Sequence, residues 1–119
     1  KVSDVLSASV CGQLWALKAN VIFYFSYIPY RTEWRYGNLA HRIALVDLGH
    51  VGENIYLAST SIDLGTCGIG ACATRICDEM FELDGENEFI IYSQTVGKVD
   101  RKDFLKEKSF YEFVEKEGL

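Results

Sequence analysis

The sequence has 119 residues and a formal net charge of −5. This length suits one compact domain, and 49% hydrophobic and 24% charged residues are ordinary for a globular protein. The acidic balance argues against broad attraction to nucleic acid, and the apolar stretches are too short to cross a membrane. The four cysteines, without a secretory pattern, indicate reduced thiols, so we expect a cytoplasmic protein.

The N-terminal part predicts a helix and then a strand. Apolar residues recur at helical spacing over residues 4–18, with Ser3 in position to cap the helix and Gly12 as its weak point. Residues 19–28 are β-branched and aromatic and stop at Pro29. That pattern predicts a buried strand.

The middle of the chain predicts a long central helix. Residues 29–41 are polar and aromatic and are expected to form a loop that leads into it. Apolar and small residues then follow at spacings of three and four over residues 42–61. Gly65 is suited to the left-handed cap that ends such a helix. Gly49 and Gly52 lie inside it, which indicates close approach of another helix or of a partner subunit.

The C-terminal part predicts a loop, two helices and a strand. Residues 66–73 are glycine-rich and read as a loop, and Thr74 is in position to cap a short helix that runs to Glu82. After a turn, residues 88–96 predict a second strand. The charged tail, residues 100–119, carries interspersed aromatic residues and predicts a short helix that docks over a surface.

Two strands are too few to support an independent sheet. An N-terminal segment or a partner chain that is not present here is therefore expected to supply further strands. This expectation follows from the pattern of predicted elements alone.

Four ordered segments carry a family resemblance: residues 45–58, 62–70, 75–83 and 92–97. In this order they resemble the central helix, the flavin loop, the next helix and the next strand of the FMN-dependent nitroreductase family. The match extends over about residues 3–100. The resemblance implies an α+β fold, with helices packed on a mostly antiparallel sheet. It also implies that residues 1–119 are the C-terminal part of a single nitroreductase-like domain, and that the protein is a homodimer with FMN at the subunit boundary.

Upstream of the central helix, the motif Trp34-Arg35-Tyr36-Gly37 and Arg42 resemble the SagB-type dehydrogenases, which oxidise azoline rings in peptides. The two resemblances leave three alternative hypotheses for the function. The first is an enzyme that moves hydride between NAD(P)H and an organic acceptor, such as a nitroaromatic or a quinone, through FMN. The second is a SagB-like peptide azoline dehydrogenase. The third is a flavin-free half-domain that only dimerises, because the arginine-rich N-terminal segment that grips the flavin phosphate in the family is absent from this chain.

The resemblance also supplies candidate cofactor contacts. A short glycine-bearing loop lets backbone N–H groups approach the flavin ring, although composition alone would allow an ordinary turn. Basic residues after the second strand suit the phosphate or are solvated surface charges, with Lys106 and Lys108 as rivals. No catalytic residue is assigned, because isoalloxazine performs the electron transfer itself. The candidate cofactor contacts are Gly68, Ile69, Gly70, Ala71, Lys98 and Arg101.

The remaining chemistry-bearing residues are read as structural. The cysteines lack the close pairs of a zinc site and are interpreted as buried thiols, so no metal site is predicted. His50 is expected in the core or at an interface. Three aromatic residues are expected to pack in the core, with a substrate pocket as the alternative. These aromatic residues are Trp34, Tyr36 and Tyr56.

Overall fold

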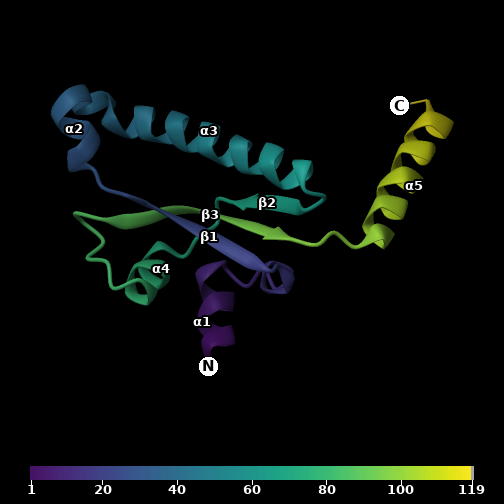
Figure 1. Cartoon of the computed structure of the whole chain (residues 1–119), viewed down its shortest axis with the longest axis horizontal. Coiled ribbons are helices and arrows are strands. Elements are labelled where there is room, and N and C mark those ends of the chain that lie inside the picture. The colour runs from purple at the N-terminus through teal and green to yellow at the C-terminus, as the bar shows by residue number, and fades with distance from the viewer. Residues whose placement is uncertain (119) are drawn as a thin grey trace.

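The computed structural model describes residues 1–118, apart from the side chains of residues 101, 103 and 104. A three-stranded antiparallel sheet carries helices on both faces (Figure 1), so the predicted α+β class with an antiparallel sheet is confirmed. The strands are β1 (Val21–Tyr27), β2 (Gly65–Ile69) and β3 (Phe89–Gly97), in the order β1-β3-β2. The helices are α1 (Val2–Ser9), α2 (Tyr30–Tyr36), α3 (Ala40–Ser61), α4 (Thr74–Met80) and α5 (Arg101–Glu117), with short 3-10 helices η1 (Ala16–Lys18) and η2 (Gly37–Leu39).

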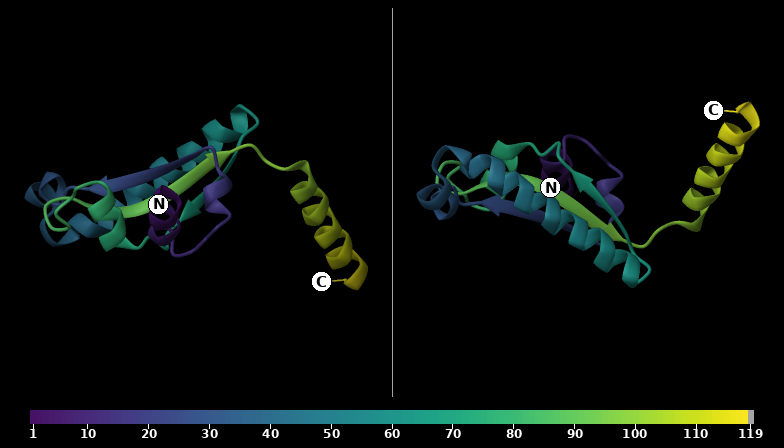
Figure 2. Two further views of the ribbon diagram at one scale, coloured as in Figure 1. Left: turned by 90° about the horizontal axis from the view of Figure 1, so that it is seen from below. Right: turned by 90° about the horizontal axis from the view of Figure 1, so that it is seen from above.

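Strand β3 is the centre of the sheet and confirms the predicted second strand. Ser93 and Gln94 in its middle are fully buried, because strands cover both of its edges and helices cover both of its faces (Figures 1 and 2). Helix α3 lies on one face, and α1, η1 and α4 lie on the other. The pairing runs from Val21↔Val96 to Tyr27↔Phe89 for β1, and from Gly65↔Gly97 to Ile69↔Ser93 for β2.

The predicted N-terminal helix is wrong in its second half. Helix α1 ends at Ser9, and the chain then reverses through Cys11 and Gly12, whose φ angles are +52° and +75°. Glycine adopts this left-handed backbone without steric cost, which allows the turn. Ser3 does not cap the helix, which begins one residue earlier and has no side-chain cap.

Strand β1 is confirmed, but the expectation that it is buried is wrong. It pairs only with β3 and forms one edge of the sheet. Val21 and Phe23 are each nearly half exposed, because within the described part of the chain α3 lies mainly against β2, at the opposite edge of the sheet. The segment that was predicted as a loop after β1 contains α2 and η2, which turn the chain back towards α3.

The predicted central helix is confirmed as α3, including its end at Ser61, but the predicted left-handed cap at Gly65 is wrong. The helix stops at Ser61, and the left-handed residue that follows is Asp63, with φ +57°. Gly65 instead begins β2, a third strand within the segment that was predicted as a loop. A side chain at position 65 would overlap the Val99 side chain, so the glycine leaves room for the segment that follows β3.

Helix α4 confirms the predicted short helix, but the predicted Thr74 cap is wrong. The capping position is Ala73, and no side chain bonds the free N–H groups there. The Ala73 N–H donates to the Ser9 carbonyl at 2.9 Å, so the end of α1 holds the start of α4. This contact fixes the segment that connects β2 with α4.

The C-terminal tail forms a helix as predicted, but its predicted docking is wrong for the described chain. Helix α5 stands away from the body after an extended linker (Figures 1 and 2). Asp100 caps its start by accepting the Lys102 N–H at 3.0 Å, and Gly118 ends it with a left-handed φ of +68°. Its described apolar side chains Leu105, Phe110, Tyr111 and Phe113 are exposed.

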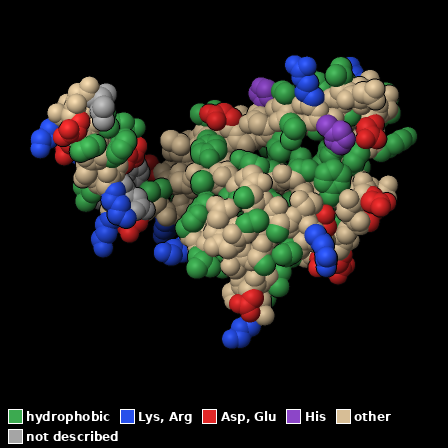
Figure 3. Space-filling model, turned by 180° about the vertical axis from the view of Figure 1, so that it is seen from behind, with side chains coloured by type: hydrophobic (Ala, Val, Ile, Leu, Met, Phe, Trp, Pro, Cys, Tyr) green, Lys and Arg blue, Asp and Glu red, His purple; other side chains and the backbone are tan. Residues whose placement is uncertain are grey.

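The buried apolar core is small compared with the apolar surface. Figure 3 shows hydrophobic side chains spread over the outside of the body and of α5. Such a surface is typical of a chain that packs against further protein. None of the described helices has both the length and the apolar character that a membrane crossing needs. The buried apolar residues are Val10, Ala16, Tyr27, Ala40, Ile69, Cys77 and Ile90.

The turn between α4 and β3 is built around one carboxylate. Asp84 Oδ1 accepts the backbone N–H groups of Glu86, Asn87 and Glu88 at 2.9, 2.8 and 3.1 Å, and its Oδ2 accepts Asn87 Nδ2 at 2.7 Å. These hydrogen bonds hold the pKa of Asp84 well below its ordinary range, and the bond from the Asn87 side chain has the largest effect. The charged carboxylate therefore closes the turn.

We predict that Asp84→Ala lowers the urea midpoint of unfolding at neutral pH and that the difference from the wild type shrinks in acid. A pKa depressed in the folded state gives stability that is fully present above the unfolded pKa of about 4 and is lost as the pH falls towards the folded value. Urea titrations at about pH 7 and pH 3 would check this. A difference that is the same at both pH values would contradict it.

Candidate cofactor site

The residues expected to approach a flavin ring lie at the end of β2. Gly68 and Ile69 are still paired with β3, and only Gly70 and Ala71 leave the strand, so the predicted loop is wrong for its first half. The Ile69 side chain is 2% exposed and packs in the core on the α1 side. Ile69 therefore offers only backbone atoms to a ligand, whereas Gly70 and Ala71 are exposed.

Two tyrosine hydroxyls enclose Gly68. Its backbone N–H donates to Tyr56 Oη at 2.8 Å, a bond that links α3 to β2. A Cβ at position 68 would overlap the Tyr92 hydroxyl, so only glycine fits while Tyr92 keeps its place. Burial, and to a smaller extent the neighbouring Tyr56, raises the pKa of Tyr92, so this phenol stays protonated at neutral pH.

A cavity of about 400 Å³ lies between α3 and the sheet, next to Gly70. Its walls are mostly apolar, and Glu53 is its one charged group among the described residues. A side chain at Gly49 or at Gly70 would meet no atom within 4 Å, so both glycines leave space open here. The cavity is lined by Leu45, Leu48, Gly49, Gly52, Glu53, Tyr56, Gly70, Ile91 and Tyr92.

A bulge in β3 shapes this cavity. The pairing passes from Phe25↔Tyr92 to Ser26↔Ile90, which leaves Ile91 as an extra residue on β3. Bulges re-aim side chains, and both Ile91 and Tyr92 line the cavity. The sequence contains no signal for the bulge, because the segment reads as an uninterrupted strand.

Gly52 packs against β3 of its own chain. A Cβ there would lie 3.4 Å from Gln94 Oε1, and Gln94 Nε2 donates to the Gly52 carbonyl at 3.2 Å and to Thr66 Oγ1 at 3.0 Å. The expectation that this glycine marks another helix or a partner subunit is therefore wrong. Gln94 Oε1 is buried and has no hydrogen-bond partner among the described residues.

Lys98 lies at the other end of β2 and borders a second hollow of about 690 Å³. It follows Gly97, the partner of Gly65, and its backbone N–H donates to Asn20 Oδ1 at 3.1 Å. Lys18 and Lys106 also line this hollow, together with the Asp100 carboxylate, which gives it a cationic balance. Arg101, the other predicted phosphate contact, has its side chain outside the described residues.

The two hollows are lined from opposite faces of the sheet, because α3 lies on one face and η1 on the other (Figure 1). Residues of α3 line the cavity beside Gly70, and Lys18 of η1 lines the hollow beside Lys98 with its neighbours Trp15 and Ala19. The strand rises by about 3.3 Å per residue, so roughly 16 Å separates the two ends of the run from Gly65 to Gly70. The structure thus places the predicted ring contacts and Lys98 at opposite ends of one edge strand.

Sequence reasoning missed Tyr92 and Lys18. Tyr92 stands two residues before Gln94 on a predicted strand, and the period of two places both on one face. That signal was available once the face towards α3 was known. Lys18 carries no such signal, because its place depends on the reversal at Gly12.

The four cysteines are free thiols, and they differ in exposure. Cys77 is buried, and burial raises its pKa to about 11, so the structural interpretation is confirmed for this residue. Cys72 is partly buried and its Sγ lies 3.3 Å from Ser93 Oγ, and burial also raises its pKa. The interpretation is wrong for Cys11 and Cys67, which are exposed.

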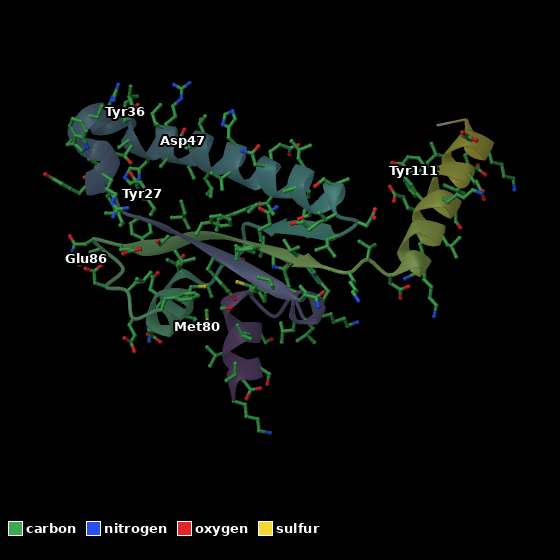
Figure 4. The ribbon with its side chains drawn as sticks, in the orientation of Figure 1. Tyr27, Tyr36, Asp47, Met80, Glu86 and Tyr111 are labelled. Atoms are coloured by element: carbon green, nitrogen blue, oxygen red, sulfur yellow. The ribbon has the colours of Figure 1, made fainter. Side chains whose placement is uncertain are left out.

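The residues around α2 do not pack in a core as expected. Trp34 is 70% exposed and Tyr36 is 40% exposed, with the Arg35 guanidinium 5.5 Å from the centre of the Tyr36 ring. Tyr36 lies at the α2 end of the molecule (Figure 4). His50 is also exposed, with Nδ1 2.8 Å from the Val46 carbonyl, so its placement in the core of this chain is wrong.

These features define an α+β protein with one long helix across an antiparallel sheet, and with an edge strand that joins an apolar cavity to a basic hollow. The sequence profile of the Nitroreductase family matches residues 2–98. The chain belongs to the nitroreductase family.

Known proteins support this assignment. A protein of Methanocaldococcus jannaschii assigned as a nitroreductase is 31% identical over 98 residues, which cover 82% of this chain and 48% of that protein. The NADPH:FMN oxidoreductase of Vibrio harveyi, solved with NAD+, has a TM-score of 0.68 at 23% identity and matches 83% of this chain and 47% of its own. The Escherichia coli microcin synthetase McbBCD complex, solved with truncated pro-MccB17, has a TM-score of 0.63 at 19% identity, over 66% of this chain and 30% of its own. The predicted nitroreductase-like fold is confirmed, and the chain spans about half the length of the relative it matches.

We predict that Gly68→Ala destabilises the protein by about 1–3 kcal/mol, because the added methyl group must displace the Tyr92 ring from a packed site. Gly70→Ala, with open space at its Cβ position, serves as the control and should leave stability nearly unchanged. Denaturant unfolding of both variants would check this. Combining Gly68→Ala with Tyr92→Leu should recover part of the loss, and strictly additive effects would contradict the contact.

Proposed function

We propose that the complete protein is an FMN-dependent oxidoreductase that transfers hydride between NAD(P)H and an organic acceptor through the flavin. The observation that carries the proposal is the polarity along β2. The apolar cavity beside Gly70 suits an uncharged ring, and Lys98 at the far end suits an anionic phosphate. FMN has these two parts at its opposite ends.

The residues present fit the cofactor. Gly70 leaves open the space that a Cβ would fill, so a flat ring is able to approach the backbone there. We infer that the backbone of Gly68, Ile69, Gly70 and Ala71 lies against the ring. Lys98 would hold the phosphate as a point charge, and Arg101 stays a sequence-based candidate for the same role. The remaining phosphate and ribityl contacts are assigned to protein outside this chain.

Bound FMN supplies the electron-transfer chemistry, and the residues of this chain supply position and environment. The bond from the Gly68 N–H to Tyr56 fixes the end of β2 relative to α3. The apolar lining of the cavity limits water around a bound ring, which strengthens the electrostatic interactions there. No residue of this chain is assigned as a proton donor to the substrate, and the catalytic residues stay unknown.

We predict that Lys98→Ala weakens FMN binding to the full-length protein about tenfold and leaves riboflavin binding unchanged. Loss of a charge-assisted contact to phosphate weakens binding by a factor of this order, and riboflavin lacks the phosphate. Fluorescence titration of the apoprotein with each flavin would check this. Lys108→Ala, on α5 but not part of the hollow lining, is the matched control.

Equal loss of FMN and riboflavin affinity would contradict the phosphate assignment. If the wild-type full-length protein binds neither flavin, the proposed function itself is wrong, and the flavin-free dimerising half-domain becomes the better description.

A second candidate function is oxidation of azoline rings in peptides. The exposed aromatic motif around Trp34 favours it, because an unpacked aromatic cluster is suited to contact a peptide. The microcin synthetase similarity, in a structure that holds a peptide precursor, adds support. Turnover of an azoline peptide by the FMN-loaded protein, without turnover of nitroaromatics or quinones, would favour this function over the first.

We also propose a homodimer with a shared flavin site. Helix α3 turns apolar side chains away from its own sheet, and Val46 and Leu57, which share one face of the helix, are 49% and 61% exposed. An exposed apolar face of this kind is typical of an interface. The cytoplasmic location expected from the sequence stays a prediction.

For the dimer, we predict that Leu57→Glu shifts the full-length protein from a dimer to a monomer and lowers FMN retention at the same time. A carboxylate in an apolar interface carries a large desolvation cost. Sedimentation velocity and the flavin absorbance of the same samples would check this. Thr74→Glu, at an exposed position on α4, is the control. A wild-type monomer at micromolar concentration with FMN bound would rule out the shared site.

A further inference from the structure

Tyr56 carries an unused hydrogen-bond donor at the cavity. Its Oη accepts the Gly68 N–H at 2.8 Å, which leaves the phenolic proton directed elsewhere. Among the described residues, no acceptor lies within hydrogen-bond range of that proton. Tyr56 lines the same cavity as Gly70 and is 38% exposed, so the proton is accessible to a bound molecule.

The mostly apolar surroundings of the Tyr56 hydroxyl strengthen any hydrogen bond that it donates. Leu48, Ile91 and Tyr92 line the same cavity, and the Tyr92 hydroxyl lies against Gly68. A hydrogen bond made in a mostly apolar cavity is stronger than one made in water. The Gly68 N–H also polarises the phenol, because a hydroxyl that accepts one bond becomes a better donor of the next.

We propose that Tyr56 donates a hydrogen bond to the flavin ring and binds the reduced ring more tightly than the oxidised ring. This inference rests on the proposed function, and it names a residue that touches the cofactor. Reduction places negative charge on the pyrimidine part of the ring. A neutral donor aimed at that charge therefore stabilises the reduced state more than the oxidised one.

Glu53 opposes this effect from the same cavity. Its carboxylate is the one charged group among the described lining residues, and it disfavours additional negative charge on a ring. The reduction potential of the bound flavin therefore depends on the balance between a donor at Tyr56 and a carboxylate one helical turn before it. Without Tyr56 the carboxylate acts alone, and the potential falls.

The test is Tyr56→Phe in the full-length protein, with FMN as the probe. We expect the Kd of oxidised FMN to rise about fivefold, as for a neutral hydrogen bond, and the Kd of reduced FMN to rise about fiftyfold, as for a charged one. The tenfold difference between them lowers the two-electron midpoint potential by about 30 mV. Anaerobic spectroelectrochemistry measures the potential, and Tyr111→Phe on the detached helix α5 is the matched control.

The outcomes separate the two proposals. If wild-type protein binds no FMN, the proposed function fails. If FMN binds and Tyr56→Phe changes neither affinity nor potential, Tyr56 does not touch the ring. Equal losses in both redox states, with an unchanged potential, would show that Tyr56 only holds Gly68 in place, and would overturn the inference.

A second variant covers the case in which Tyr56→Phe disturbs β2. Tyr56→3-fluorotyrosine keeps the ring and the bond from Gly68 and makes the phenol a stronger donor. We expect it to raise the midpoint potential at neutral pH, opposite in sign to the effect of Tyr56→Phe. A potential that stays at the wild-type value would overturn the inference independently of folding.

Discussion

The structure depends on the burial of polar groups along β3. This strand pairs on both edges, and its polar residues bond to every layer around it. Gln94 donates to the backbone of α3, Ser93 lies against the Cys72 thiol, and the Ile90 N–H donates to the buried Asp78 carboxylate on α4 at 2.7 Å. Because unpaired polar groups are costly in an interior, these bonds fix where the helices lie on the two faces. The apolar core is too small to do so alone.

The same sheet is incomplete, and its exposed surfaces show where. Within the described part of the chain, β1 and β2 each pair along one edge only, β1 exposes part of its α3 side, and α3 and α5 expose apolar side chains. An open sheet edge with apolar residues beside it favours pairing with further protein. The chain corresponds to about half of its relative from Methanocaldococcus jannaschii, which agrees with this surface. The site also depends on further protein, because β2 is an edge strand and the two hollows beside it are open on the side where that protein would pack.

Within the site, the glycines provide space and the tyrosines provide hydrogen-bonding groups. Glycines at positions 49 and 70 create space, and Gly68 lets a phenol approach the backbone closely. Tyr56 and Tyr92 then supply the hydroxyls in a cavity that is otherwise mostly apolar. A cavity with apolar walls and a few placed polar groups orients a planar ligand more than it attracts one. The charge that attracts an anionic ligand lies at the other end of β2, around Lys98.

The sequence by itself determined the class of the fold, α3, the strands β1 and β3, and the family. Hydrophobic periodicity and ordered motifs are local features of the sequence, so they can be read without knowing which segments pack together. It did not determine β2, because Gly65–Ile69 has the composition of a loop and becomes a strand only through pairing with β3. Nor did it place the glycines: Gly52 and Gly68 look alike in sequence, but one packs on Gln94 and the other beneath Tyr92. Side-chain contacts between distant segments decide such details, and only the tertiary structure sets them.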